Sequence, residues 1–206
     1  CGFPHCAFCG FNNELWEMQR REGFREVAEK ENLPVPVYES PWRGSNVSRW
    51  DLEIEQLGKW LDDLPKPIGI MACNDARALH LLNACHQAGL LVPEEVAIVG
   101  VDNEEIFCEL CNPALSSVAP DAERIGYQAA ELLDQLMSGR TPPCQRILID
   151  PLQIVTRRSS DTLAIQDRTV ATALRFISEQ ALHGCTVTDV VNFARVSRSF
   201  LERRFR

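Results

Sequence analysis

Polar side chains of the kinds that bind sugars follow three apolar stretches of this chain. These residues are Asn12, Asn13, Trp16 and Arg20, then Asn74 and Asp75, then Asp102, Asn103 and Glu104. Carboxylates and an arginine fork bind hydroxyl groups well, and an indole ring covers the apolar face of a sugar ring. Ligands of open parallel sheets bind beyond the carboxyl ends of the strands. We therefore expect a sugar site, and the side chains expected to line it are Arg20, Asp75, Asp102 and Trp16.

Each of these four residues also has a structural explanation. Asp75 could cap the helix that begins beside it, and Asp102 could shape a turn with Asn103. Arg20 could be a surface residue of its helix, and Trp16 could pack in the core. Asp75 and Asp102 could also be an acid–base pair of a sugar hydrolase or isomerase. No GxSxG, HExxH or glycine-rich phosphate loop supports catalysis, so we expect a binding protein and not an enzyme.

A second chemical pattern lies in the C-terminal stretch TVTDVVNFARVSRSFLERRFR. Thr186 and Ser197 can cap two short helices, and Leu201 and Phe205 fall on one face of the second. The polar side chains on its other faces are Arg198, Ser199, Glu202 and Arg203. A short helix with one apolar face and long polar side chains suits the major groove of DNA. The structural alternative is an ordinary helical hairpin with a solvated basic face.

Composition agrees with two parts of different character. The 206 residues are 45% hydrophobic and carry a net charge of −8, whereas residues 165–206 hold seven arginines and only four acids. An acidic body with a mildly basic tail fits a regulator with a separate DNA-binding head. No run of 18 apolar residues and no signal peptide is present, so we expect no membrane partner and a cytoplasmic location. Cys1 at the start and Arg206 in mid-helix predict a fragment.

The nine cysteines are an odd number, and four of them form the CxxC pairs Cys6/Cys9 and Cys108/Cys111. Four thiolates could hold zinc. However, the first pair lies in an apparent strand, where residues three apart point to opposite faces. In a chain without a signal peptide we expect reduced thiols that pack as small hydrophobic side chains, with no metal and no cofactor.

The elements that must position these residues alternate. Apolar strands are predicted at 6–11, 35–38, 68–73 and 96–101, and amphipathic helices at 14–31, 48–64 and 75–88. Later segments are an extended stretch at 115–119, a helix at 121–137 and short strands at 146–149 and 153–156. We expect Phe24, Leu15 and Val27 to face inward, and Ser48 to begin a capping box. The alternation predicts an α/β fold with a parallel sheet. The expected division is an α/β domain over 1–156, a linker over 157–167 and a helical domain over 168–206.

The α/β part and the C-terminal helical part each resemble a known protein family. IGIMACNDARALHLLNACHQAGLLVPEEVAIVGVDNEE, QRREGF and LSSVAPDAERIGYQAAELL are similar to the C-terminal subdomain of LacI-type sugar-sensing domains, which are periplasmic-binding-protein-like. The resemblance implies ligand-binding roles for Arg20, Asp75 and Asp102. It also implies that the sugar lies between two subdomains and that most of the other one precedes Cys1. The segment from Leu115 onward would return to that half, so its apolar surface should be exposed.

The pattern SxxxLxRxFR resembles the first helix-turn-helix of the AraC/XylS family, and LRFISEQALHGCTVTDVV fits the helices before it. The resemblance implies that Ser199, Glu202 and Arg203 face base edges and that Arg198 lies near the DNA backbone. One departure is Arg195, where the family usually has glycine in the turn. A non-glycine residue with positive φ costs roughly 1–2 kcal/mol.

Together, the two resemblances imply a sugar-responsive transcription regulator that binds operator DNA and forms a homodimer at full length. The implied effector is D-xylose or a related pentose, although the residues alone do not distinguish a pentose from a hexose. A sugar-binding module without DNA binding is the alternative.

Overall fold

The computed structural model describes residues 3–41, 50–140, 146–161, 167–180 and 182–205, and its centre is a six-stranded sheet. The strands are β1 (His5–Asn12), β2 (Val37–Pro41), β3 (Ile68–Ala72), β4 (Val96–Val101), β5 (Ser116–Ala119) and β6 (Gln153–Val155). Their order is β2-β1-β3-β4-β5-β6, with parallel pairing throughout except that β6 runs antiparallel to β5. The predicted α/β fold with a parallel sheet is confirmed.

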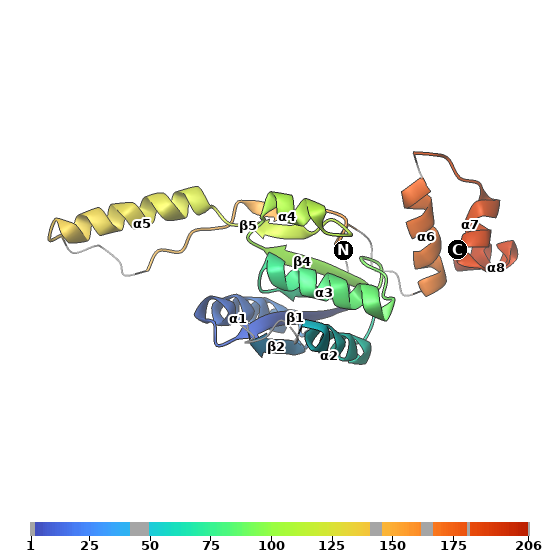
Figure 1. Ribbon diagram of the computed structural model, residues 1–206, viewed down its shortest axis with the longest axis horizontal. Coiled ribbons are helices and arrows are strands. Elements are labelled where there is room, and N and C mark those ends of the chain that lie inside the picture. The colour runs from blue at the N-terminus through green and yellow to red at the C-terminus, as the bar shows by residue number, and fades with distance from the viewer. Residues whose placement is uncertain (1–2, 42–49, 141–145, 162–166, 181, 206) are drawn as a thin grey trace.

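Helices cover both faces of this sheet (Figure 1). The helices of this part are α1 (Leu15–Lys30), α2 (Trp50–Asp63), α3 (Asp75–Ala88), α4 (Glu105–Leu110) and α5 (Ala122–Met137). On one face, α2 and α3 bury Leu57 and Leu81 in a cluster with Ile70, and on the other, Phe24 of α1 packs against Phe8. Both faces of the central strands are therefore buried, as continuous apolar strands require.

Several details differ from the predictions. Leu15 and Val27 are exposed, because α1 packs through Phe24 and Trp16. Helix α4 was not predicted. Residues 146–149 form no strand, and the predicted cap Ser48 lies outside the described residues.

Helix α5 projects away from the sheet (Figure 1). None of its residues is buried, and its exposed apolar side chains include Tyr127, Leu133, Leu136 and Met137. The expected exposure of apolar surface after Leu115 is confirmed for this helix.

Residues 157–160, which we call the strap, were predicted to begin the linker but instead pack against the sheet. The Ser159 hydroxyl donates to the Ile98 carbonyl oxygen at 2.6 Å, and the Ser159 carbonyl oxygen accepts from the Ile98 amide at 2.8 Å. Ser159 is fully buried. The sheet domain therefore extends beyond residue 156, because the strap satisfies the backbone groups of Ile98 in β4, one residue before the pairing of β4 with β5 begins.

Three helices, α6 (Arg168–Gln180), α7 (Val187–Ala194) and α8 (Arg198–Arg204), follow the strap. They share a small core of Ala173, Val190 and Leu201. Phe205 was predicted to be buried but is 46% exposed, because it lies past the end of α8. None of the described helices is long and apolar enough to cross a bilayer.

Local chemistry explains the turn between α7 and α8. Thr186 and Asp189 form a capping box at the start of α7, and Ser197 caps α8 by accepting from the Phe200 amide. Arg195 ends α7 with φ 53° and ψ 39°. The turn therefore keeps its left-handed residue without glycine, and the strain is tolerated.

Candidate functional site at the strand ends and on helix α8

Arg20, Asp102 and Trp16 converge at the carboxyl ends of β1, β3 and β4, a surface that we call the rim. The Arg20 guanidinium donates to the Asp102 carboxylate at 2.8 Å and to the Cys73 carbonyl oxygen at 2.7 Å. It also lies over the Trp16 ring, 5.1 Å from its centroid. Residues 82 positions apart thus meet at one edge of the sheet, as expected from parallel strands.

The rim combines the groups that a sugar site needs. The side chains of Arg20 and Asp102 are 29% and 40% exposed, so both groups remain accessible to a ligand. The Trp16 indole N–H donates to Glu14, and its ring packs beside Phe8 and Phe11. Trp16 therefore both packs in the core and borders the rim.

Asp75 lies beneath the rim instead of on it. It is 3% exposed, and its carboxylate accepts from the Ser117 hydroxyl at 2.6 Å, the Glu104 amide at 3.0 Å and the Cys108 thiol at 3.4 Å. Burial raises the pKa of this carboxyl, although the three hydrogen bonds act in the opposite direction. A Cβ on Gly100 would overlap it. In this structure Asp75 supports the rim from below, and the direct ligand role expected from the sequence stays a prediction.

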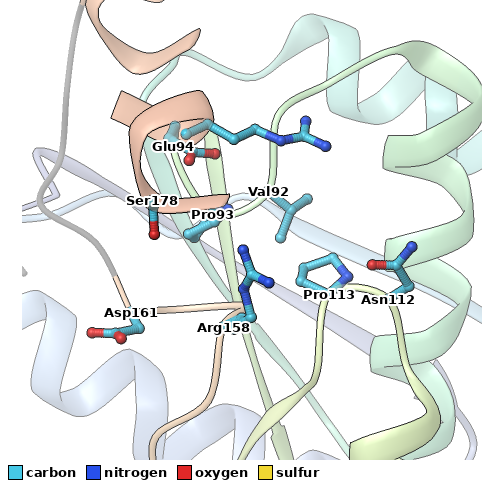
Figure 2. A pocket seen from close by; sticks show the side chains of 9 residues that line it. Val92, Pro93, Glu94, Asn112, Pro113, Arg158, Asp161 and Ser178 are labelled. Carbon is cyan, nitrogen blue, oxygen red and sulfur yellow. The ribbon is translucent and has the colours of Figure 1, made fainter. Parts of the chain in front are cut away.

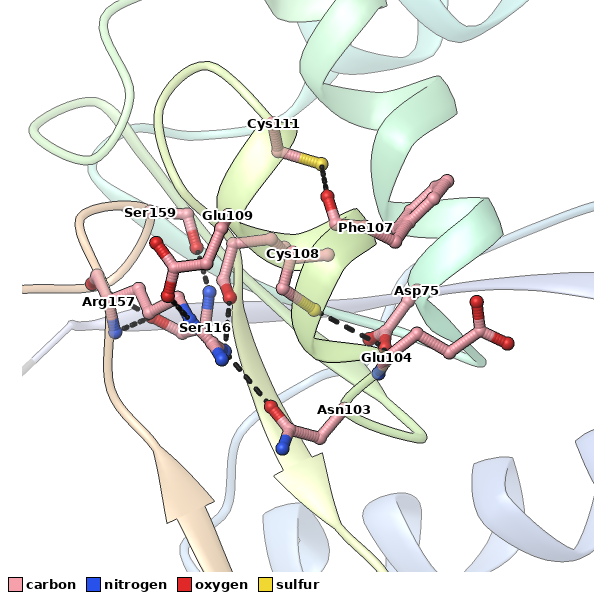
Figure 3. A network of polar contacts seen from close by, with 11 residues as sticks. Asp75, Asn103, Glu104, Phe107, Cys108, Glu109, Cys111, Ser116, Arg157 and Ser159 are labelled. Carbon is pink, nitrogen blue, oxygen red and sulfur yellow. Dashed lines mark hydrogen bonds and ion pairs between the residues drawn. The ribbon is translucent and has the colours of Figure 1, made fainter.

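The turn that carries Asp102 is held by hydrogen bonds from several sides, and Figure 3 shows the contact between Asn103 of this turn and Arg157. Asp102 and Asn103 have φ values of 109° and 50°, a region that most non-glycine residues avoid and that aspartate and asparagine adopt more readily. The Asn103 amide donates to Ser117, and the Asn103 side-chain oxygen accepts from Arg157. These contacts fix the direction in which Asp102 meets Arg20.

Asn74 is a rim residue that the choice of Asp75 over its neighbour missed. Asn74, and not Asp75, caps α3, because its side-chain oxygen accepts from the Arg77 amide at 2.9 Å. It follows Cys73, whose carbonyl oxygen binds Arg20. Asn74 is itself 7% exposed, so it lies beside the rim in sequence and is largely covered by α3.

A buried arginine supports this part of the rim. Arg77 is fully buried and donates to Glu53 at 2.7 Å and to Ser40 at 3.0 Å. Its guanidinium lies over the rings of Phe11 and Tyr38. Arg77 therefore ties β1, β2 and α2 to the first turn of α3, where Asn74 caps the helix.

A cavity of about 130 Å³ lies elsewhere, between the sheet domain and α6 (Figure 2). Its walls are Val92, Pro93, Glu94, Asn112, Pro113, Arg158, Asp161, Arg175 and Ser178. None of the predicted ligand residues lines it. It marks a junction of the two parts of the chain and not the rim.

The predicted DNA-contacting residues Arg198, Ser199, Glu202 and Arg203 are all exposed on α8. Arg198 donates to Glu202 at 2.8 Å across one turn, and Arg203 donates to the Ser199 carbonyl oxygen at 3.2 Å. Leu201 on the other face is buried. This face of α8 thus presents only polar groups bound to one another, and a partner could replace those contacts.

Most of the cysteines that the structure describes are buried. Those that the structure describes are free, and burial raises the pKa of Cys73 and of Cys108 to about 12. Among the described residues, no three His, Cys, Asp or Glu side chains gather closely enough to hold a metal ion. Cys9 of β1, Cys73 after β3 and Cys108 of α4 are fully buried and thus act as small core groups.

Comparison with known proteins places this geometry in a family. The periplasmic binding protein-like domain matches residues 1–160. The chain belongs to this family. It is also 38% identical to the xylose operon regulatory protein of Haemophilus influenzae over 208 residues, and 36% identical to that of Escherichia coli, covering 100% of this chain and 53% of each relative. The chain therefore spans about half the length of the curated relatives it matches.

Solved structures of transcription regulators are also similar to this chain. A structure of the xylose-binding transcription activator xylR aligns with a TM-score of 0.80 and 36% identity, over 98% of this chain and 53% of that one. A LacI family regulator from Arthrobacter in complex with lactose aligns with a TM-score of 0.62 and 25% identity, over 78% of this chain and 59% of that one. The first alignment includes nearly all of the chain, whereas the family model ends at residue 160, just before α6.

Proposed function

We propose that this chain is part of a sugar-responsive, sequence-specific DNA-binding transcription regulator that controls genes of sugar catabolism, and that it is not an enzyme. The observation that carries the proposal is the Arg20–Asp102 pair beside Trp16 at the strand ends. This set of an ion pair and an aromatic ring suits a polyhydroxylated ligand. The relatives that match the whole chain are regulatory proteins of xylose operons.

The effector that we propose is D-xylose or a related pentose. The names of the relatives support this choice. Arg20 and Asp102 would bind hydroxyl groups directly, Trp16 would border the ring, and Asn74 would add an amide. Asp75 would hold the turn from below. The ligand would lie between the rim and a second subdomain, which the resemblance to LacI-type sensors implies.

The DNA-binding part that we propose is α6–α8, acting as an AraC-type helix-turn-helix with α8 in the major groove. Ser199, Glu202 and Arg203 would face base edges, and Arg198 would lie near the phosphates. The exposed polar face of α8 and its buried Leu201 support this role. We expect the full-length protein to be a homodimer that works in the cytoplasm, where the DNA is, with no membrane partner.

Two measurements on the full-length protein test the proposal. Calorimetry with D-xylose, L-arabinose, D-ribose and D-glucose should show binding of at least one pentose. A gel shift with duplexes selected from random-sequence DNA should show binding that weakens as salt rises, because phosphate contacts release counterions. Sugar binding without any DNA binding would favour the alternative, a sugar-binding module whose C-terminal helices are a plain helical tail. Turnover of a sugar would support the hypothesis of a sugar hydrolase or isomerase.

A further inference from the structure

Arg157 lies where the rim turn, α4 and the strap meet. Its side chain is 8% exposed. The guanidinium donates to the Asn103 side-chain oxygen at 3.0 Å, to the Leu115 carbonyl oxygen at 3.0 Å and to the Glu109 carboxylate at 2.7 Å (Figure 3). A planar guanidinium with three acceptors in fixed directions holds all three in register. Arg157, the first residue of the strap, thus connects the strap to the Asp102–Asn103 turn, which we call the rim turn.

The rim end of this connection is a strained element. Asp102 and Asn103 both have positive φ, and their carboxylate and amide side chains bind different arginines. Asp102 binds Arg20, and Asn103 binds Arg157. A ligand that forms hydrogen bonds with Arg20 or Asp102 changes the forces on a turn that its surroundings hold against its own preference.

The other end of the connection leads to the C-terminal helices. Within the strap, Ser159 is bound to Ile98 of β4, and its amide donates to the Ala114 carbonyl oxygen. The strap is therefore hydrogen-bonded to β4 two residues after Arg157. Further on, Arg158 and Asp161 line the same cavity as Arg175 and Ser178 of α6 (Figure 2).

Beyond that cavity, an ion pair reaches helix α8. Asp167, just before α6, binds Arg204 of α8 at 3.1 Å. This ion pair ties the start of α6 to the last turn of α8.

We propose that Arg157 is a positioning residue that couples the sugar rim to the C-terminal helices. It does so by binding Asn103 in one of two arrangements of the Asp102–Asn103 turn. This rests on the proposed function. The sugar must bind one arrangement better than the other, and the resulting change in DNA affinity must equal the change that DNA causes in sugar affinity.

The test uses the full-length protein, D-xylose and a duplex selected from random-sequence DNA with the wild-type protein. The dissociation constant of the duplex is measured with and without D-xylose, and the ratio of the two is the readout. For the wild type we expect a ratio of at least roughly fivefold. Arg157→Ala should lower the ratio to less than about twofold while both ligands still bind, whereas a purely structural role would weaken stability or both affinities without changing the ratio.

Two further variants sharpen the result. Glu109→Ala removes the exposed acceptor of the same guanidinium and should keep the wild-type ratio. Asn103→Gly removes the side chain that accepts from Arg157, and glycine tolerates the positive φ at this position. This variant should lower the ratio of dissociation constants as much as Arg157→Ala does. It also decides the matter if Arg157→Ala does not fold.

The outcomes separate the two proposals. A wild-type ratio in both Arg157→Ala and Asn103→Gly would overturn the coupling role and leave the proposed function intact. No sugar binding, or no effect of sugar on DNA binding, in the wild type would overturn the proposed function, and the coupling role with it. If Glu109→Ala also lowered the ratio below about twofold, the proposed role of Asn103 would be overturned. The effect would then follow from losing any acceptor of Arg157 and not from the one at the rim.

Discussion

The carboxylates of Asp75 and Glu202 differ in almost every contact that they make. Asp75 is 3% exposed and accepts three hydrogen bonds from β5, α4 and the rim turn. Glu202 binds only Arg198 on its own helix, in a pair whose side chains are 56% and 71% exposed. The first contact set fixes one geometry, whereas the second is weak and easily exchanged.

The difference indicates two strategies of recognition. Under the proposed function, buried partners at the rim would hold the ligand-binding groups before a ligand arrives, which would lower the entropy cost of binding a small molecule. The side chains of α8 would instead keep their freedom and adapt to DNA. The predictions below test this contrast, from the largest expected effect to the smallest.

Removing the buried carboxylate should destabilise the sheet domain most. Asp75→Ala leaves the Ser117 hydroxyl and the Glu104 amide without their acceptor, and we expect a loss of about 3 kcal/mol of unfolding free energy. Urea unfolding of the full-length protein measures it. As a control, Asp134→Ala on the exposed side of α5 should cost less than about 0.5 kcal/mol. Equal losses would break the contrast.

Removing a polar side chain from α8 should instead spare stability and change DNA recognition. Arg203→Ala should lose about 1–3 kcal/mol of discrimination between the selected duplex and random DNA, because its side chain is exposed and, among the residues that the structure describes, binds the Ser199 carbonyl oxygen alone. Competition gel shifts measure the discrimination, and calorimetry should show unchanged sugar affinity. Unchanged discrimination would count against the position of α8 in the groove.

Relief of strain in the turn before α8 should stabilise the C-terminal helices. Arg195 has φ 53°, and Arg195→Gly should gain up to about 1 kcal/mol after the added freedom of the unfolded chain is subtracted. Thermal unfolding measures the gain. Arg195→Ala removes the same side chain but keeps the Cβ atom, so it should gain nothing. A gain of the same size in Arg195→Ala would show that strain is not the cause.

The smallest effect should be a pH dependence at α1. Both carboxylate oxygens of Glu17 are buried without hydrogen-bond partners, and burial raises the pKa of this group. A raised folded-state pKa means that stability is present at acid pH and is lost as pH rises above the unfolded value of about 4.3. Glu17→Gln should therefore be more stable than the wild type at neutral pH, and the advantage should shrink towards pH 4 in urea unfolding. If the stability advantage of Glu17→Gln grew as the pH fell, the predicted direction of the pKa shift would be wrong.

The sequence predicted most of the helices and strands, although not α4, and it predicted the convergence of Arg20 and Asp102, because strand ends in a parallel sheet meet at one edge. It did not predict that Asn74 caps α3 while Asp75 lies beneath the rim, since the two are adjacent and only the packing against Ser117 and Glu104 places Asp75 below. Residues 146–149 have the composition of a strand but no neighbouring strand to pair with, and strand preference depends on such pairing.

Arg157 shows a different limit. Residues 157–160 are polar and look like a linker, and only hydrogen bonds to distant residues, such as those to Asn103 and Ile98, make them part of the sheet domain. A pattern along the sequence does not contain these pairings. By contrast, Thr186 and Ser197 were predicted as caps because their acceptors act on amides two or three residues away.

The most direct test of the central claim is calorimetric titration of D-xylose into three forms of the full-length protein. The wild type and Arg25→Ala, which removes an exposed arginine of α1 that pairs only with Glu22 and Glu29, should bind with the same affinity. Arg20→Ala should bind at least roughly tenfold more weakly, since a charged hydrogen bond contributes about 1.5–3 kcal/mol. Equal affinity in all three forms would contradict the placement of the sugar at the rim.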